Sequence, residues 1–303
     1  MYFKYHFILI SFFILNYSCS QQSDGVKNSN TKVAVSSSID SLKENESFYF
    51  INMEGEILKE RFSAPKGYQR FDSEEGSFGY YLQHLKLQPH GSKVKYYDGS
   101  EKTNYGVYLA VLDQEIGNQD LHQCADAIMN LYARHHFEQQ RFDEIHFNFT
   151  NGWRCDFKKY AEGYRISLQG NSTNWVKKKD PSYSIKTFEE YLIWIYSYCG
   201  TASLEKELQK VDNLLDVQIG DVFIKGGYPG HAVLVVDMVK NDAGEKKIML
   251  AQSYMPAQQM QILQNPINED ENNPWYTIHT IQNRDILETP EWRFELNQLK
   301  RFK

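Results

Sequence analysis

The spacing of apolar and polar positions predicts helices in the first half of the chain and strands in the second. Apolar residues that recur every three or four positions indicate amphipathic helices, whereas alternating or short continuous apolar runs indicate strands. Helices are predicted over residues 77–87, 120–140, 184–199 and 201–211, and strands over residues 92–100, 105–113, 145–152, 221–224, 231–239 and 247–254. Because helices precede strands instead of alternating with them, the pattern favours an α+β fold over a parallel α/β fold.

Capping residues predict where two of these helices begin and end. Asp120 is a natural N-cap for a helix of about five turns, which places Cys124 within its first turn or so. Gly200 is expected to end the helix that starts near Ser184, and Cys199 lies at that end.

The register of the last two strands predicts which side chains meet. The segment 241–244 has the composition of a hairpin turn. A turn centred there pairs residues whose numbers add up to about 485, so His231 faces Tyr254 and has Gln252 as its diagonal neighbour on the same face. Tyr254 is a poorer orienting residue, and Ser253 points to the opposite face; a shift of one residue in the turn would exchange these roles.

The first residues predict export and a lipid anchor. Phe7–Leu15 is apolar but too short to span a bilayer, and the segment Leu15–Cys19 resembles a bacterial lipobox. Residues 1–19 are therefore expected to be a lipoprotein signal peptide, with Cys19 lipidated and anchored in a membrane; an ordinary secretory signal is the alternative. Polar residues 20–49 are expected to form a flexible tether, and residues 50–303 a single globular domain in the cell envelope, periplasmic or surface-exposed.

Composition restricts the partners and the chemistry. The chain of 303 residues is 41% hydrophobic and carries a net charge of -6 with interspersed signs, so no nucleic acid is expected as a partner. His135 and His136 lack the spacing of a helical zinc motif, and neither a metal nor a cofactor is expected. Without Cys19, an odd number of cysteines remains, namely Cys124, Cys155 and Cys199, so at least one free thiol is expected outside the cytosol.

Three residues from separate segments form a candidate catalytic site. A helix start lowers the pKa of a thiol such as Cys124, a strand histidine such as His231 can accept its proton, and Gln252 can orient the imidazole. The alternative interpretation is that Cys124 is a small core residue and His231 a core histidine bonded to a backbone carbonyl.

Two strand segments, "GDVFI" and "GHAVLVVD", resemble the papain-like NlpC/P60 and CHAP domains, and the resemblance covers about residues 120–254. It implies a papain-like fold in which helices pack on an antiparallel sheet. It also implies a membrane-tethered cysteine amidase or peptidase that acts on peptidoglycan or another peptide substrate. In this interpretation Cys124 is the nucleophile, His231 the general base and Gln252 the orienting residue.

A closer resemblance extends over the whole mature chain. The carrying segments are "SFGYYLQHL", "DLHQCADAIMNLYARHH", "GDVFIKGGYPGHAVLVVD", "LAQSYMPAQQMQIL", "PWY" and "TPEW". They are similar to an uncharacterised bacterial lipoprotein family classed as a domain of unknown function, which carries no established reaction. The alternative to a hydrolase is therefore a non-catalytic lipoprotein that binds glycan or a partner protein.

Overall fold

The computed structural model describes residues 50–303, with the exception of residues 171 and 268–271. These residues belong to one compact unit, Leu42–Lys303. The expected signal peptide, the lipidation site Cys19 and the tether lie outside the described residues. Within the described part, every helix is too short or too polar to cross a bilayer.

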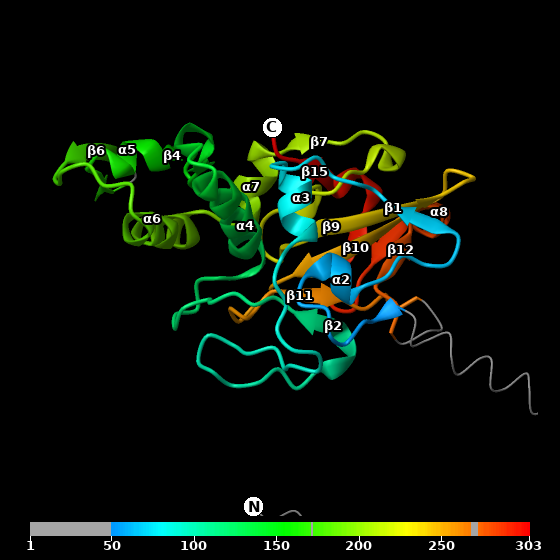
Figure 1. Ribbon diagram of the computed structural model, residues 1–303. Coiled ribbons are helices and arrows are strands. Elements are labelled where there is room, and N and C mark those ends of the chain that lie inside the picture. Colours follow the sequence, from blue (N-terminus) through cyan, green and yellow to red (C-terminus); the bar gives the residue numbers. More distant parts are fainter. Residues whose placement is uncertain (1–49, 171, 268–271) are drawn as a thin grey trace, which may run out of the picture. The chain divides into compact units, whose positions relative to one another are not determined.

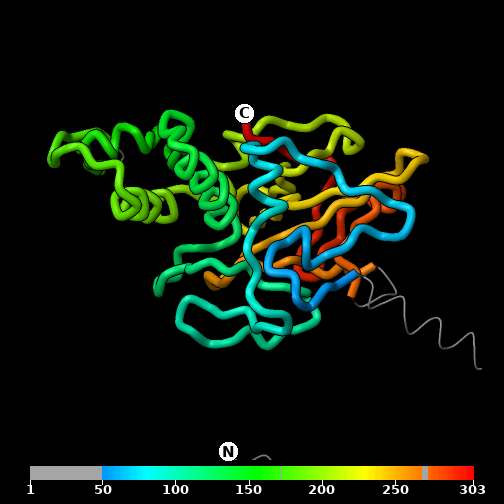
Figure 2. The backbone as a smooth tube through the Cα atoms, viewed as in Figure 1, coloured from blue at the N-terminus to red at the C-terminus, as the bar shows by residue number. Residues whose placement is uncertain are grey.

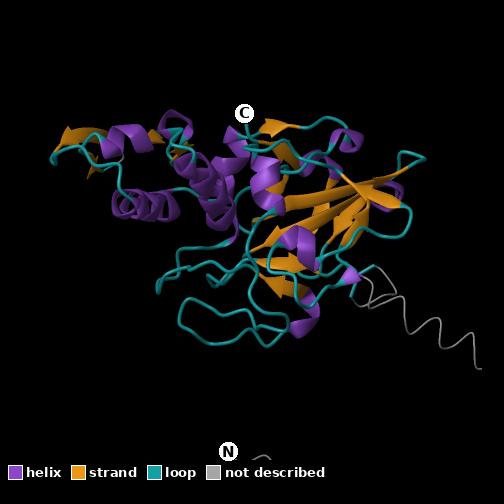
Figure 3. Cartoon of the chain, in the orientation of Figure 1, coloured by secondary structure: helices purple, strands orange, loops and turns teal. Residues whose placement is uncertain are grey.

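A nine-stranded antiparallel sheet forms the centre of the fold, with the strand order β2-β11-β10-β9-β8-β15-β7 and with β1 and β12 paired to β9 and β10 (Figures 1 and 3). Its strands are β1 (Tyr68–Arg70), β2 (Tyr108–Val111), β7 (Gln209–Lys210), β8 (Val222–Lys225), β9 (His231–Asn241), β10 (Lys246–Gln252), β11 (Gln261–Leu263), β12 (Trp275–Thr277) and β15 (Leu299–Arg301). The predicted α+β class is confirmed.

Helices α3, α4 and α7 pack against the central strands of this sheet, and α8 packs against β10 and β12. Residues 139–200 leave the sheet and build a smaller layer beside α4, seen as the green excursion in Figure 2. The helices are α2 (Leu58–Arg61), α3 (Phe78–Gln83), α4 (Cys124–Glu138), α5 (Phe157–Ala161), α6 (Ile185–Tyr198), α7 (Thr201–Glu207) and α8 (Ile278–Arg284). Three further hairpins pair β3 (His146–Asn148) with β4 (Arg154–Asp156), β5 (Tyr164–Gln169) with β6 (Ser172–Lys177), and β13 (Ile286–Glu288) with β14 (Arg293–Glu295).

Strand β9 is buried on both faces, which explains its continuous apolar sequence. Ala232 and Leu234 belong to the core that contains the inner face of α4. Val233 and Val235 belong to a second core, which contains residues of α8. Since side chains alternate along a strand, each face of β9 supports one of the two cores.

The predicted start of the long helix was wrong. Helix α4 begins at Cys124, and its N-cap is Gln123, whose backbone N–H donates to the Asp126 carboxylate at 3.1 Å. The carboxylate of Asp120 instead accepts hydrogen bonds from the backbone N–H of Ala257 and from the side chain of Gln123. Cys124 is therefore the first residue of its helix, closer to the helix start than the sequence indicated.

The hairpin register predicted from the sequence is confirmed next to the site. The pair Ala251 and Leu234 adds up to 485, whereas pairs nearer the turn, such as Lys247 and Val239, add up to 486. A β-bulge between Met249 and Leu250 accounts for the difference. The strand predicted over residues 92–100 was wrong, because this segment forms only isolated bridges around a tight turn at Asp98–Gly99.

Candidate active site

Cys124 is held at the point where the start of α4 meets the start of β9. Helix α4 packs against β9, and the Cys124 side chain is nearly enclosed, with 6% of the residue exposed. Backbone N–H groups of Ala125, Ala232 and Cys124 itself interact favourably with the thiolate form of the sulfur. Ala232 directly follows His231 in the chain, so the fold brings the thiol beside the segment that carries the histidine.

Burial dominates the electrostatics of this thiol. It raises the pKa of Cys124 to about 12, and the charge of Asp126 adds to the rise, while the three backbone N–H groups oppose it. Desolvation disfavours a thiolate more strongly here than the helix start favours it. In this conformation the sulfur is therefore a protonated thiol at neutral pH.

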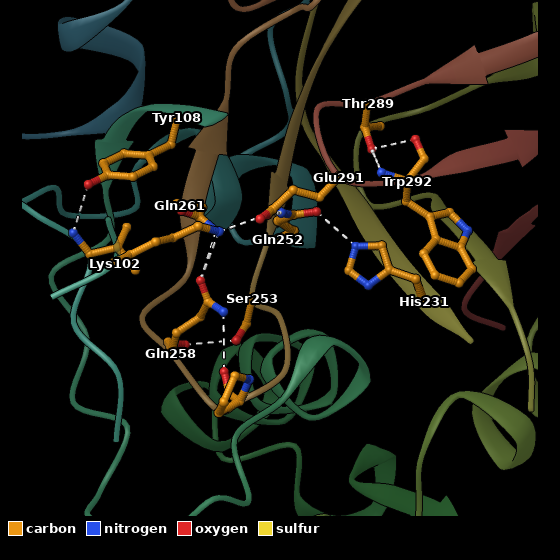
Figure 4. Close-up of polar contacts among 12 residues, drawn as sticks. Lys102, Tyr108, His231, Gln252, Ser253, Gln258, Gln261, Thr289, Glu291 and Trp292 are labelled. Atoms are coloured by element: carbon orange, nitrogen blue, oxygen red, sulfur yellow. Dashed lines mark hydrogen bonds and ion pairs between the residues drawn. The ribbon is translucent and has the colours of Figure 1, made fainter. Parts of the chain in front are cut away.

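His231 is the first residue of β9 and is bonded to the residue that the sequence selected as its partner. Its Nε2 lies 2.8 Å from Oε1 of Gln252, the last residue of β10 (Figure 4). Only 1% of His231 is exposed. Burial lowers its pKa to about 4, although the hydrogen bond to Gln252 opposes this shift. The imidazole is therefore neutral at pH 7 and able to accept a proton.

The imidazole lies with the second core, not with the core under α4. Its ring centroid is 5.5 Å from that of Trp292 and 5.9 Å from that of Phe294. By strand alternation His231 shares its face with Val233 and Val235. The thiol lies at the backbone amide of the next residue, Ala232, whose side chain points to the opposite face, into the core under α4.

Tyr254 packs beside the imidazole of His231. Its ring centroid is 4.6 Å from that of His231. Burial raises the pKa of its phenol, and the charges of Glu291 and Cys124 contribute to the rise. Tyr254 is partly exposed, so the ring that packs beside His231 also faces solvent.

Behind Gln252 lies a charged pair that sequence reasoning missed. The Gln252 amide donates from Nε2 to Oε2 of Glu291 at 2.7 Å, and the same oxygen accepts from Nζ of Lys102 at 2.7 Å (Figure 4). Glu291 belongs to the quoted segment "TPEW", which was the only signal in the sequence for this part of the site. Lys102 had none, because it is distant in sequence from every other member.

A serine next to Gln252 links the sheet to the segment before α4. Oγ of Ser253 lies 2.7 Å from the carbonyl oxygen of Gln258 and 3.1 Å from that of His122. His122 precedes Cys124 by two residues. The end of β10 therefore helps to position the chain just ahead of the thiol.

A wide groove lies elsewhere on α4. It has a volume of about 1040 Å³, and its walls come from α3, the segment 112–122, α4 and α6. Neither Cys124 nor His231 lines it. Its charged lining residues are mostly acidic: Glu75, Asp113, Glu115, Glu138 and Glu189 against Lys86 and Arg134. The groove therefore offers a binding surface for polar or cationic groups that is separate from the thiol.

The other cysteines and the potential metal ligands bear on the chemistry that the site can perform. Cys124, Cys155 and Cys199 are all free thiols. Among the residues that the structure describes, no group of three or more His, Cys, Asp or Glu side chains is arranged to hold a metal ion.

The wholly buried His122 gives a testable pH dependence of stability. Burial lowers its pKa to about 4, and its Nε2 lies 3.0 Å from Nδ2 of Asn130. In the unfolded chain a histidine titrates at about 6.5, so between pH 6.5 and 4 the unfolded state binds a proton that the folded state does not. Stability is thus lost as the pH falls through this window. We expect His122→Gln, which keeps an acceptor for Asn130, to reduce the slope of unfolding free energy against pH by about 1.4 kcal/mol per pH unit.

Urea denaturation of wild type and variant at pH 7, 6 and 5 measures this slope. Equal slopes in the two proteins would show that His122 takes up its proton without unfolding.

Comparison with known proteins identifies a family but no reaction. The family model described as "Domain of unknown function (4846)" matches residues 58–301. No curated protein and no solved structure matches the chain.

Proposed function

Since the chain belongs to the family of domain of unknown function 4846, whose description names no reaction, we propose a function from the site itself. The proposed function is that of a papain-like cysteine amidase or peptidase, tethered to a membrane and acting outside the cytoplasm on peptidoglycan. The tether and the location are proposed from the lipobox-like segment that ends at Cys19.

One observation carries the proposal: the thiol at the first residue of α4 lies against the backbone amide of Ala232, which directly follows His231 in β9, and Nε2 of His231 is bonded to Gln252. A hydrogen bond at Nε2 leaves Nδ1 as the nitrogen that can accept the thiol proton. A nucleophile, a base and a group that orients the base are the parts that thiol hydrolysis requires.

The proposed reaction has two steps. His231 takes the proton of Cys124, and the sulfur attacks the carbonyl carbon of the amide. The carbon–nitrogen bond then breaks, the leaving amine receives the proton from His231, and a thioester remains. Water, deprotonated by His231, cleaves the thioester, which releases the carboxylic acid and restores the thiol. The backbone N–H of Cys124 is proposed to stabilise the oxyanion.

Labelling with iodoacetamide and digestion of purified peptidoglycan test this proposal. We expect Cys124→Ala to abolish both the alkylation of residue 124 and the release of peptidoglycan fragments. Cys199→Ala is the matched control, because Cys199 is a free thiol outside the site, and it is expected to retain both. Fragment release by Cys124→Ala at the rate of wild type would exclude Cys124 as the nucleophile.

A second candidate function is supported by the groove and by the protonation states. The thiol is enclosed and protonated, and it does not line the groove. Both features suit a non-catalytic lipoprotein that binds glycan or a partner protein. In that case Cys124→Ala would still sediment with insoluble peptidoglycan as wild type does, and wild type would release no fragments.

A further inference from the structure

The segment Thr289–Trp292, which has no role in the function proposed above, forms a closed turn between β13 and β14. The backbone N–H of Thr289 donates to the carbonyl oxygen of Trp292 at 2.8 Å, and the Trp292 N–H donates to Oγ1 of Thr289 at 3.1 Å. The hydroxyl of Thr289 in turn donates to the Trp292 carbonyl oxygen at 2.9 Å. These bonds fix the turn, so the side chains of Glu291, within it, and of Trp292, at its end, have defined positions.

Both side chains point into the proposed site (Figure 4). The Trp292 ring packs near the His231 ring, and Oε2 of Glu291 lies 2.7 Å from Nε2 of Gln252. Gln252 is wholly buried, so its amide has no water to satisfy it and depends on these protein partners.

The carboxylate of Glu291 decides which end of the Gln252 side-chain amide is the NH₂ group and which is the oxygen. A carboxylate only accepts hydrogen bonds, so the end of the Gln252 amide that faces Glu291 must be the NH₂ group. The carbonyl oxygen Oε1 must then face His231, where it lies 2.8 Å from Nε2. An amide oxygen cannot donate, so Nε2 carries the imidazole proton. Nδ1 of the neutral ring is left with a free lone pair.

Lys102 holds the Glu291 carboxylate in the position that the hydrogen bonds from Glu291 through Gln252 to His231 require. Only 2% of Lys102 is exposed, and its Nζ donates to Glu291 at 2.7 Å and to Oε1 of Gln258 at 3.1 Å. The Lys102 side chain can only donate hydrogen bonds, so it holds the Glu291 carboxylate in place as an acceptor.

We infer that Glu291, held by Lys102, is a positioning residue: it fixes the amide of Gln252 and thereby keeps the proton of His231 on Nε2. The catalytic consequence rests on the proposed function, because only a base with a free Nδ1 can take the Cys124 proton. The tautomer itself does not rest on that function and can be measured without a substrate.

The ¹⁵N NMR shifts of the His231 ring at pH 7 report the tautomer directly. We expect the Nε2–H form in wild type. In Glu291→Ala, the Gln252 amide is free to rotate and to donate to Nε2. The ratio of Nε2–H to Nδ1–H should then fall by about tenfold or more, which corresponds to the loss of one hydrogen bond to a charged group. Glu291→Gln retains an acceptor oxygen and should keep the wild-type tautomer.

Two further variants keep the test decisive. Lys102→Met combined with Glu291→Ala avoids an unpaired buried ammonium, and it should show the same change of tautomer if the single variant folds poorly. Glu288→Ala, three residues earlier and bonded to Arg284 and Arg293, is the matched control and should leave the ring unchanged. An unchanged Nε2–H signal in the double variant would overturn the inference.

The outcome is separable from that of the proposed function. If Cys124 of the wild type is alkylated by iodoacetamide and the wild type hydrolyses peptidoglycan, Glu291→Ala should slow both reactions by about tenfold or more. Glu291→Gln should restore both rates. If wild type does neither, the proposed function fails while the shift of the His231 tautomer still decides the role of Glu291.

Discussion

Replacement of Arg70 by methionine is expected to lower the free energy of unfolding by about 3 to 5 kcal/mol, because it leaves a buried carboxylate without its cation. Asp237 lies in β9 with none of its surface exposed, and its Oδ2 is 2.8 Å from Nε of Arg70 in β1. Burial raises the pKa of Asp237, and Arg70 is the strongest group that opposes the rise.

The remaining partners of Asp237 cannot replace the arginine. Oδ1 accepts from the Gln83 side chain at 2.8 Å and from the backbone N–H of Met238 at 2.9 Å. Both donors are neutral, so they satisfy hydrogen bonds without balancing the charge. Arg70 also donates to the carbonyl oxygens of Lys59 and Phe62, and through these bonds it ties the segment 59–70 to the sheet.

Urea denaturation of four proteins tests this pair: wild type, Arg70→Met, Asp237→Leu and the double variant. If the cost comes from the uncompensated charge, the double variant should be more stable than Arg70→Met alone, since no charge then remains buried. A loss in Arg70→Met below about 1 kcal/mol, the range of exposed ion pairs, would show that water reaches Asp237.

Local signals in the sequence were sufficient for several elements. The helix predicted over residues 77–87 is present as the shorter α3, with Ser77 as its N-cap and the Ser77 Oγ accepting from the Tyr80 N–H at 3.1 Å. The Asn241–Gly244 turn predicted the hairpin, and the turn together with the β-bulge between Met249 and Leu250 sets the register that brings Gln252 to His231. Helix starts and hairpins that depend on neighbouring residues or on a short loop can therefore be predicted from the sequence.

Features that depend on contacts between residues far apart in the sequence could not be predicted from it. Asp120 has the composition of an N-cap, but the Ala257 N–H, which is far away in the chain, takes up its carboxylate, and the helix starts later. The prediction of a lowered pKa for the Cys124 thiol was also wrong. Sequence position suggested a thiol activated by a helix start, whereas the tertiary enclosure of Cys124 raises its pKa to about 12. Lys102 and Glu291 meet Gln252 only because three separate segments converge.

Removal of the Tyr254 ring is expected to activate the Cys124 thiol, and this is the largest functional effect that we predict outside the catalytic residues. Enclosure is the main cause of the raised thiol pKa, and Tyr254 is a partly exposed side chain that packs beside the imidazole and interacts electrostatically with Cys124. In Tyr254→Ala, water reaches the sulfur, and the pKa of the thiol should fall towards its ordinary value. The three backbone N–H groups at the sulfur would then no longer be outweighed by burial.

Each unit by which the thiol pKa falls raises the thiolate fraction about tenfold as long as the pH stays below the pKa. The rate of alkylation of residue 124 by iodoacetamide at pH 8 should therefore rise by about 10- to 100-fold in Tyr254→Ala. Tyr254→Phe keeps the ring and should react at the rate of wild type. Tyr228→Ala removes a tyrosine that is 93% exposed in the turn before β9, and it serves as a control for general loosening of the fold.

Three results would contradict this explanation. Equal rates in wild type and Tyr254→Ala would mean that other side chains enclose the sulfur. A rise in Tyr228→Ala as large as that in Tyr254→Ala would point to breathing of the 226–230 turn instead of loss of the ring. A rise in Tyr254→Phe would assign the effect to the hydroxyl group and its charge partners Glu291 and Cys124, not to enclosure. If the rise is confined to Tyr254→Ala, a substrate must displace this ring before Cys124 can react, and the protonated thiol is then the resting form of an enclosed nucleophile.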